Sequence, residues 1–122
     1  MRAKNFVAFN YRKRSGKYNA VSKTVDGISF HSKKEAAYYS QLKIEQRCKL
    51  IESFKRQVSF DLFAWSPEGR VRVCAHIVDF LVTLPDGATE VREVKGFATD
   101  VWDLKRKLFE GNYPQIPYKV IR

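Results

Sequence analysis

The sequence predicts one α/β domain in which helices pack on a mixed sheet. Three observations support this prediction: two segments with helix-capping residues, three strand-like segments between them, and a short strand-like segment near the end of the chain. The order helix, three strands, helix, strand is typical of an α/β layer structure with a mixed sheet. A chain of 122 residues can bury one compact core and is too short for two ordinary domains.

The predicted domain covers residues 18–122 and follows a basic N-terminal arm, residues 1–17. Asp26-Gly27 is a turn dipeptide that predicts a short hairpin or an extended lead-in across residues 24–30. Ser32 followed by Glu35 is a capping-box pattern, and good helix formers continue to about Arg47. We therefore expect the first helix over residues 32–47.

Alternating apolar and polar residues predict strands over residues 51–63 and 70–84, and a third strand over 90–95. Turn sequences separate them at residues 66–69 and 85–87, so consecutive strands should pair as hairpins. Thr99 or Asp100 should cap a second helix that reaches Glu110, because Gly111-Asn112 is a helix-ending pair. A last short strand is expected over residues 115–121.

The charge balance points to a polyanionic partner. The chain has 23 Lys and Arg against 13 Asp and Glu, a formal charge of +10, and a pI near 9.8. Nucleic acid is the polyanion that such a balance favours. Six of the basic residues and no acidic residue fall within the first 20 positions. The arm is therefore predicted to bind phosphates, the alternative being a merely solubilising extension.

The sequence predicts a cytoplasmic protein with no membrane association. Its apolar runs are only a few residues long, far below the roughly 20 that a membrane-spanning helix needs, and no signal-peptide block stands at the N-terminus. Cys48 and Cys74 are far apart in the sequence. Their spacing suggests neither a disulfide framework nor a cysteine-based zinc site, which fits a reducing compartment.

Two predicted strands bring charged residues to one place. On the second strand we take Val71, Val73, Ala75 and Ile77 as the inward face, so that Asp79 is its next member. On the third strand Glu93 and Lys95 share a face. Charges on a core-facing row are costly unless they are paired or bind a metal. Together with Glu35, on the sheet-facing side of the first helix, these hard oxygen ligands predict a site for Mg²⁺ or Mn²⁺.

The pattern of Asp79, thirteen residues, and Glu93-Val94-Lys95, after a helix that carries Glu35, resembles the PD-(D/E)XK nuclease superfamily, also called restriction-endonuclease-like. Residues 18–113 are similar to small phage-encoded nucleases of this superfamily. The motifs that carry this similarity are Tyr18-Asn19-Ala20, Asp26-Gly27-Ile28, Phe30-His31-Ser32-Lys33-Lys34-Glu35-Ala36, Asp79-Phe80, Val94-Lys95-Gly96 and Leu104-Lys105-Arg106-Lys107.

The resemblance implies a restriction-endonuclease-like core, with a four-stranded mixed sheet flanked by helices, and two-metal hydrolysis of phosphodiesters. It also implies a homodimer acting on branched DNA such as Holliday junctions, in the host-cell cytoplasm if the chain is phage-encoded. Glu35, Asp79 and Glu93 match the carboxylates of the family motif, Lys95 matches its lysine, and the Val94 carbonyl would complete the metal shell. The sequence has Val78 where the pattern has Pro, and His31, where close relatives have Asp, receives no catalytic role.

Basic residues that the sequence predicts to contact DNA are Arg12, Lys13, Arg14, Lys17, Lys33, Lys34 and Lys105. A solvated helix face is the alternative for Lys105, and simple helix capping is the alternative for Glu35. Trp65 and Trp102 are predicted to be core or dimer-interface residues. The predicted function is Mg²⁺-dependent DNA cleavage, with junction resolution favoured. The alternatives are a nicking or double-strand endonuclease of phage DNA replication or packaging, and a catalytically inactive DNA-junction-binding protein.

Overall fold

The computed structural model describes residues 22–122, which divide into two compact units at Tyr39 and Ser40. The predicted arm, with the candidate DNA contacts Arg12, Lys13, Arg14 and Lys17, lies outside the described residues. No helix in residues 22–122 is long and apolar enough to cross a membrane.

The described part of the first unit is a hairpin followed by the start of a helix. Strands β1 (Lys23–Val25) and β2 (Ile28–Phe30) pair antiparallel. Asp26 and Gly27 both have positive φ, 53° and 78°, as a two-residue hairpin turn requires. Tyr39 then packs its ring 5.1 Å from that of Phe30 and donates a hydrogen bond to Asp26 Oδ2. Of the two predicted alternatives, the structure has the hairpin.

Helix α3 (Lys33–Arg47) begins where the capping box predicts. The Ser32 hydroxyl accepts the backbone N–H of Glu35 at 3.1 Å, which satisfies one of the unpaired donors of the first turn. After Arg47 the chain leaves the helix, and Lys49 adopts a left-handed φ of 64°. The C-terminal half of α3 belongs to the second unit.

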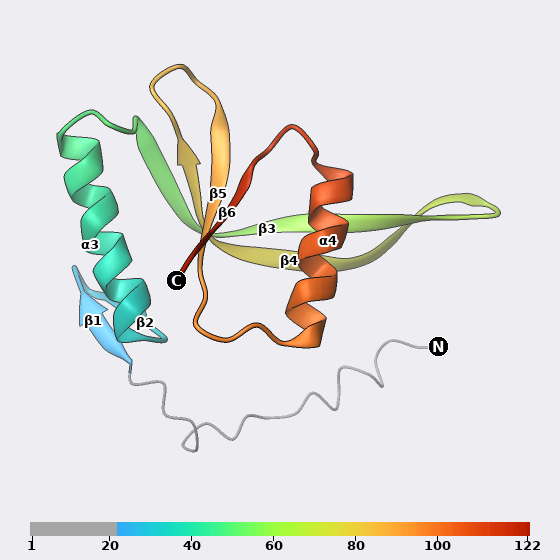
Figure 1. The fold of residues 1–122 in the computed structure, drawn as a ribbon, viewed down its shortest axis with the longest axis horizontal. Coiled ribbons are helices and arrows are strands. Elements are labelled where there is room, and N and C mark those ends of the chain that lie inside the picture. Colours follow the sequence, from blue (N-terminus) through green and yellow to red (C-terminus); the bar gives the residue numbers. More distant parts are fainter. Residues whose placement is uncertain (1–21) are drawn as a thin grey trace. The chain divides into compact units, whose positions relative to one another are not determined.

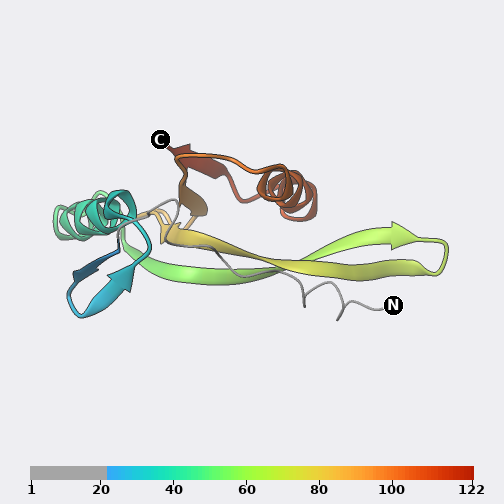
Figure 2. The same cartoon turned by 90° about the horizontal axis from the view of Figure 1, so that it is seen from below.

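The second unit contains a four-stranded mixed sheet, and this prediction is confirmed. Its order is β3 (Ser53–Ser66), β4 (Gly69–Thr83), β5 (Thr89–Val94), β6 (Tyr118–Ile121). The first two pairings are antiparallel, and β5 pairs parallel with β6. Helix α4 (Asp100–Asn112) connects β5 to β6 (Figure 1). Figure 2 shows α4 on one face of the long β3–β4 hairpin.

Most predicted boundaries agree with the structure to within three residues. The Thr99 hydroxyl accepts the backbone N–H of Trp102 at 3.1 Å and caps α4 as expected. β6 is shorter than predicted and begins after Pro117. Proline lacks the N–H that a paired strand donates, and the segment before it is a turn in which the Ile116 N–H binds the Tyr113 carbonyl.

One core cluster of this unit lies between α4 and the sheet. Leu62, Val78, Val91 and Phe109 are fully buried and contact one another as a cluster. The Phe60 ring meets that of Phe109 edge-on, with centroids 4.9 Å apart. Burying each large apolar side chain contributes about 1.5–3 kcal/mol, so this cluster holds α4 firmly against the sheet.

The predicted inward face of β4 is wrong. Val71, Val73 and Ile77 are exposed, whereas Cys74, His76 and Val78 of the opposite phase face the α4 core. Period-two alternation cannot decide between two phases when both carry apolar residues. Here Cys74 and His76 alternate with the exposed valines Val71 and Val73 along the strand, and it is Cys74 and His76 that face the core.

The strand then exchanges its faces near Asp79. Val78 and Leu81 both contact the α4 core cluster, although they are three residues apart and a regular strand would point them in opposite directions. Opposite this point on β3, Gln57 has a φ of 51° and lies between the pairs Arg56–Phe80 and Val58–Val78. This irregularity reaims the side chains that follow it.

Candidate active site

The β4 and β5 strands separate at Asp79 and Glu93. Their ladder runs from Thr83–Thr89 to Phe80–Arg92 and stops there. One step further, the Asp79 backbone N–H donates to Glu93 Oε1 at 3.0 Å, and the Val94 N–H donates to Asp79 Oδ2 at 2.9 Å. Each carboxylate thus takes the place of a backbone acceptor on the neighbouring strand. We call this pair of hydrogen bonds the carboxylate clasp.

The clasp fixes two acidic groups next to one another at the point of strand separation. Charge-assisted hydrogen bonds of this kind are shorter and stronger than neutral ones. Each carboxylate uses one oxygen in the clasp, and its second oxygen is not engaged by it. The structure therefore brings Asp79, Glu93 and Val94 together, as the sequence predicts, although the predicted reason, an inward row that includes Val71 and Val73, is incorrect.

Burial makes Glu93 difficult to ionise. Its side chain is only 4% exposed, and this burial, with the nearby charge of Asp79, raises the pKa of Glu93 from 4.5 to about 7. The Asp79 N–H, the ammonium of Lys95 and the indole of Trp102 act in the opposite direction and lower that pKa. The net result is a raised pKa of Glu93, and additional positive charge near the two carboxylates would lower it again.

A pocket of about 320 Å³ opens beside the clasp. Its lining combines Glu93 with two lysines, Lys95 and Lys105, and with apolar and polar residues of β4 and α4: Ala75, His76, Ile77, Thr99, Val101 and Trp102. Lys95 holds its Nζ 5.0 Å from the centre of the Trp102 ring, a cation–π arrangement. The predicted Lys95 and Lys105 therefore both line the pocket that Glu93 also lines.

Sequence reasoning gave no role to the polar residues behind this pocket. His76 is buried, and its Nε2 shares a hydrogen bond of 2.8 Å with the Tyr118 hydroxyl. Burial, followed by the charges of Lys105 and Lys95, lowers the pKa of His76 to about 4. Burial and the charge of Glu93 raise the pKa of Tyr118 above its usual value. A histidine between the apolar residues Ala75 and Ile77 of β4 was the available sequence signal.

The donor atoms suit a hard divalent cation. Carboxylate and main-chain carbonyl oxygens are the ligands of Mg²⁺ and Mn²⁺, and Mg²⁺ keeps several waters beside one or two protein carboxylates. Within residues 22–122 no three His, Cys, Asp or Glu side chains gather into a metal-binding group. The clasp thus offers two carboxylates, and a cation between them would offset the charge that raises the pKa of Glu93.

The other predicted site residues belong to the first unit. Glu35 is buried in the first turn of α3, where its own N–H binds Ser32, and Lys33 and Lys34 are exposed in the same turn. Their predicted roles, a metal ligand for Glu35 and DNA contacts for the lysines, stay predictions.

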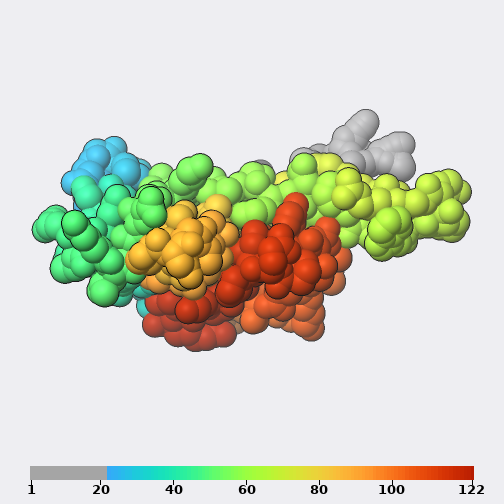
Figure 3. Space-filling model, turned by 90° about the horizontal axis from the view of Figure 1, so that it is seen from above, coloured from blue at the N-terminus to red at the C-terminus, as the bar shows by residue number. Residues whose placement is uncertain are grey.

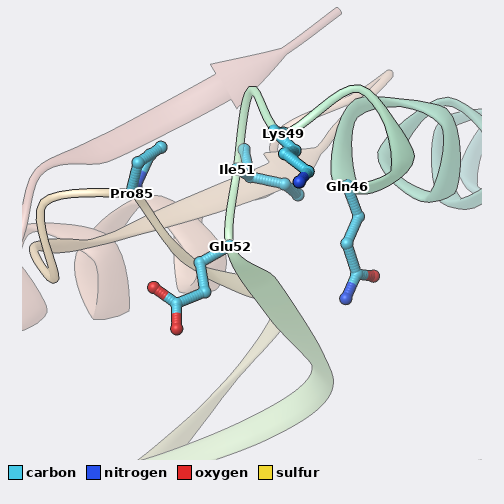
Figure 4. Close-up of a pocket in the computed structure, with 5 residues that line it drawn as sticks. All are labelled: Gln46, Lys49, Ile51, Glu52 and Pro85. Carbon is cyan, nitrogen blue, oxygen red and sulfur yellow. The ribbon is translucent and has the colours of Figure 1, made fainter.

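A separate hollow of about 380 Å³ lies between the end of α3, the α3–β3 connection and the β4–β5 turn (Figure 4). It is lined by Gln46, Lys49, Ile51, Glu52 and Pro85. Figure 4 shows the charged ends of Lys49 and Glu52 pointing apart. Since no polar groups converge there, we regard the pocket beside the clasp as the better candidate site.

Comparison with known proteins gives one match. A family model described as "Protein of unknown function (DUF1064)" matches residues 15–122. The chain belongs to this family. The match includes every residue of the clasp and of the pocket beside it. For this DUF1064 member, neither a curated protein nor a solved structure matches.

Proposed function

We propose that this DUF1064 protein is a DNA endonuclease that hydrolyses phosphodiester bonds with Mg²⁺ or Mn²⁺. The observation that carries the proposal is the carboxylate clasp, which holds Asp79 and Glu93 side by side with Lys95 lining the adjoining pocket. Two acidic groups and one lysine on diverging strands are the arrangement expected of a metal-assisted phosphodiester hydrolase.

The fold supports a restriction-endonuclease-like core as part of the same proposal. The mixed sheet has β4 and β5 antiparallel and β5 and β6 parallel, with α4 as the connection between the last two. The two motif segments come from β4 and β5 and meet where these strands separate. This is the topology that the resemblance to PD-(D/E)XK nucleases implies.

Each residue has a distinct task in the proposed reaction. Asp79 and Glu93, with the Val94 carbonyl, would hold the cation, which would supply Lewis acidity and a nucleophilic water at neutral pH. The ligand role of Glu35, which belongs to the first unit, stays a prediction. Lys95 brings a fixed positive charge to the place where negative charge grows on the phosphate. The hydrogen bonds of the clasp hold the carboxylates in position before substrate binds, so little reorganisation is needed during the reaction.

The basic residues near the site and the positive charge of the chain favour DNA as substrate. Lys105 lines the pocket, and the chain as a whole carries +10, so phosphate contacts can surround the carboxylates. Branched DNA, with Holliday junctions as the leading case, is the proposed substrate. Two symmetrical cuts then require two active sites, which a two-fold homodimer of this chain would supply.

The test is cleavage of DNA by the wild-type protein and by matched variants. A labelled four-way junction and a linear duplex of the same sequence are incubated with Mg²⁺, with Mn²⁺ or with EDTA. Asp79→Asn, Glu93→Gln and Lys95→Ala should each lower the cleavage rate at least 100-fold. Glu110→Gln and Lys107→Ala change exposed residues of α4 that pair within the helix and should leave the rate within twofold.

The outcomes separate the alternatives. Preferential cutting of the junction supports junction resolution, whereas equal cutting of both substrates supports a general nicking or double-strand endonuclease. Binding of DNA without cleavage in either metal would overturn the enzymatic proposal in favour of a DNA-binding protein. Circular dichroism of each variant confirms that a lost rate is not a lost fold.

A further inference from the structure

The β3–β4 hairpin continues beyond the part of the sheet that α4 covers. The last pair in contact with the α4 core is Leu62–Cys74. We call the continuation, residues 63–73, the hairpin arm. Figure 3 shows its yellow-green tip extending past the orange-red α4. In this stretch β4 pairs only with β3, because its ladder with β5 covers Phe80–Thr83.

The arm is anchored at its base. The Asn112 side chain at the end of α4 accepts the Phe63 N–H at 2.8 Å and donates to the Phe63 carbonyl at 3.2 Å. The Tyr113 hydroxyl donates to the Asp61 carbonyl at 2.7 Å. β3 is the edge strand of the sheet, and these bonds satisfy backbone groups that a further strand would otherwise pair with. They also fix the direction in which the hairpin arm leaves the core.

Hydrogen bonds within the turn also order the tip of the hairpin arm. The Ser66 hydroxyl accepts the backbone N–H of Glu68 at 3.1 Å and donates to the Gly69 carbonyl at 3.0 Å. Gly69 has a φ of 115°, which favours glycine at this position. The turn is therefore closed by its own hydrogen bonds, and the arm presents its side chains on a defined surface.

One face of the arm alternates aromatic rings with guanidinium groups. In the pairing register Trp65 lies opposite Arg70, and Phe63 lies opposite Arg72. The Arg70 guanidinium lies 4.0 Å from the centre of the Phe63 ring, and Arg72 forms an ion pair with Asp61 at 3.0 Å. A guanidinium stacked on a ring keeps the N–H groups at its edge available for a phosphate.

Trp65 has no role in the core. Its side chain is 81% exposed, so of the two predicted places, core or dimer interface, the core is wrong for Trp65 and the dimer interface stays a prediction. Trp102, at 8% exposure, is buried. An exposed indole on a rigid strand loses little conformational entropy when it stacks on a ligand. The Trp65 indole is thus available for stacking on a flat ligand.

We propose that the hairpin arm is a second DNA contact, in which Trp65 stacks on a nucleobase and Arg70 binds a phosphate. This inference rests on the proposed function, because it takes DNA as the ligand. In continuous duplex both faces of every internal base are covered by neighbouring bases. A branch point or single-stranded segment exposes such a face, so the arm selects branched DNA.

The position of the arm sets the geometry of the contact. Gln57 faces Asp79 across the β3–β4 hairpin, and Trp65 lies eight residues further along β3. At about 3.3 Å per residue, Trp65 is roughly 26 Å from the clasp. This spans about eight base pairs of duplex at 3.4 Å each. The base contacted by Trp65 should therefore lie about eight base pairs from the cleaved phosphate.

The experiment measures binding of full-length protein to a labelled four-way junction and to a linear duplex by fluorescence anisotropy, in EDTA so that neither is cut. Trp65→Ala should weaken junction binding roughly 5- to 100-fold, the range for loss of one base–aromatic stack, and change duplex binding less than twofold. Val71→Ala is the control, since Val71 is exposed on the same arm but pairs with Ala64, on the other face. It should leave both affinities unchanged.

Intrinsic fluorescence gives an independent measurement. The chain has two tryptophans, and only Trp65 is exposed. Junction binding should quench the emission of the wild type, and Trp65→Phe should abolish this quenching while retaining an aromatic ring for stacking. Unchanged quenching in that variant would contradict the proposal.

Failure of this inference is distinct from failure of the proposed function. If Trp65→Ala binds both DNAs as the wild type does, the arm proposal is overturned, and Mg²⁺-dependent cleavage that depends on Asp79 still stands. If the variant alters the oligomeric state in size-exclusion chromatography but not DNA affinity, the arm contacts a second copy, and the proposal is also overturned. Selective loss of junction binding by a variant that cuts linear duplex at the wild-type rate supports it.

Discussion

Replacing Glu93 by glutamine should stabilise the metal-free protein at neutral and alkaline pH. Glutamine keeps an oxygen that can accept the Asp79 N–H, as Glu93 Oε1 does. It removes a buried negative charge that lies beside the charge of Asp79. A variant that loses the proposed activity is thus expected to be the more stable protein, as is common where an active site holds groups in an unfavourable environment.

The magnitude follows from the pKa of Glu93. A rise from 4.5 to about 7 on folding corresponds to about 3 kcal/mol. Between these pH values the folded protein retains a proton that the unfolded chain has released, so the free energy of unfolding falls as the pH rises through this window. Below it, Glu93 is protonated in both states and the penalty is absent. Since the amide also needs hydrogen bonds when buried, we expect a net gain of about 1–3 kcal/mol at pH 8 and about zero at pH 4.

The assay is urea unfolding, followed by circular dichroism, of wild type and Glu93→Gln in EDTA at pH 4, 6 and 8. The comparison at each pH cancels the titration of all other groups. Adding Mg²⁺ at pH 8 should then stabilise the wild type and not the variant, because ligand that binds only the folded state raises its stability. A variant that is less stable than the wild type at pH 8, or a difference that does not change with pH, would refute this reasoning.

Three further changes test other parts of the structure. Replacing His76 by Phe should make stability less sensitive to acid. The pKa of His76 is about 4 in the folded protein and 6.5 in the unfolded chain, so the free energy of unfolding of the wild type falls by up to about 3 kcal/mol as the pH falls through that window. Urea midpoints at pH 7 and 5 measure this, and a variant with the same difference between the two midpoints as the wild type would contradict it. Arg92→Met should destabilise by roughly 1–3 kcal/mol, because Glu90, 4% exposed, loses its 2.8 Å partner and keeps Lys119 at 3.3 Å. Thermal unfolding measures this, and a cost below about 0.5 kcal/mol would show that the pair contributes little. Gln57 has a φ of 51°, a left-handed conformation that disfavours branched side chains. Gln57→Gly should therefore be at least as stable as the wild type, and the free energy of unfolding of Gln57→Val should be about 1–2 kcal/mol lower. Equal stabilities of the two variants in urea would contradict the left-handed conformation.

Local sequence signals were sufficient for most of the fold. The Asp26-Gly27 turn, the Ser32 cap and the Thr99 cap all act through neighbours within three residues, so their effect is legible in the sequence itself. The hairpin turns likewise fix which strands are antiparallel. The parallel pairing of β5 with β6 depends on how α4 packs, and the sequence predicted a mixed sheet without indicating which strand the last one pairs with.

The candidate site shows where sequence reasoning stops. Asp79, Glu93 and Lys95 were identifiable by spacing and charge, but the phase of β4 was predicted incorrectly, because the exchange of faces depends on the irregularity opposite Gln57. The hydrogen bond between His76 and Tyr118 joins residues 42 positions apart. No pattern of period two or 3.6 reveals such a pairing, since it follows from the packing of α4 and β6 on the sheet.

The central claim is that Asp79 and Glu93 hold one catalytic centre for a divalent cation. Its most direct test is a crystal structure after Mn²⁺ soaking, with the manganese located by anomalous scattering. We predict a peak bound by carboxylate oxygens of both residues at about 2.0–2.2 Å, absent in Asp79→Asn. Manganese elsewhere, or no bound manganese at a concentration that supports DNA cleavage, would contradict the claim.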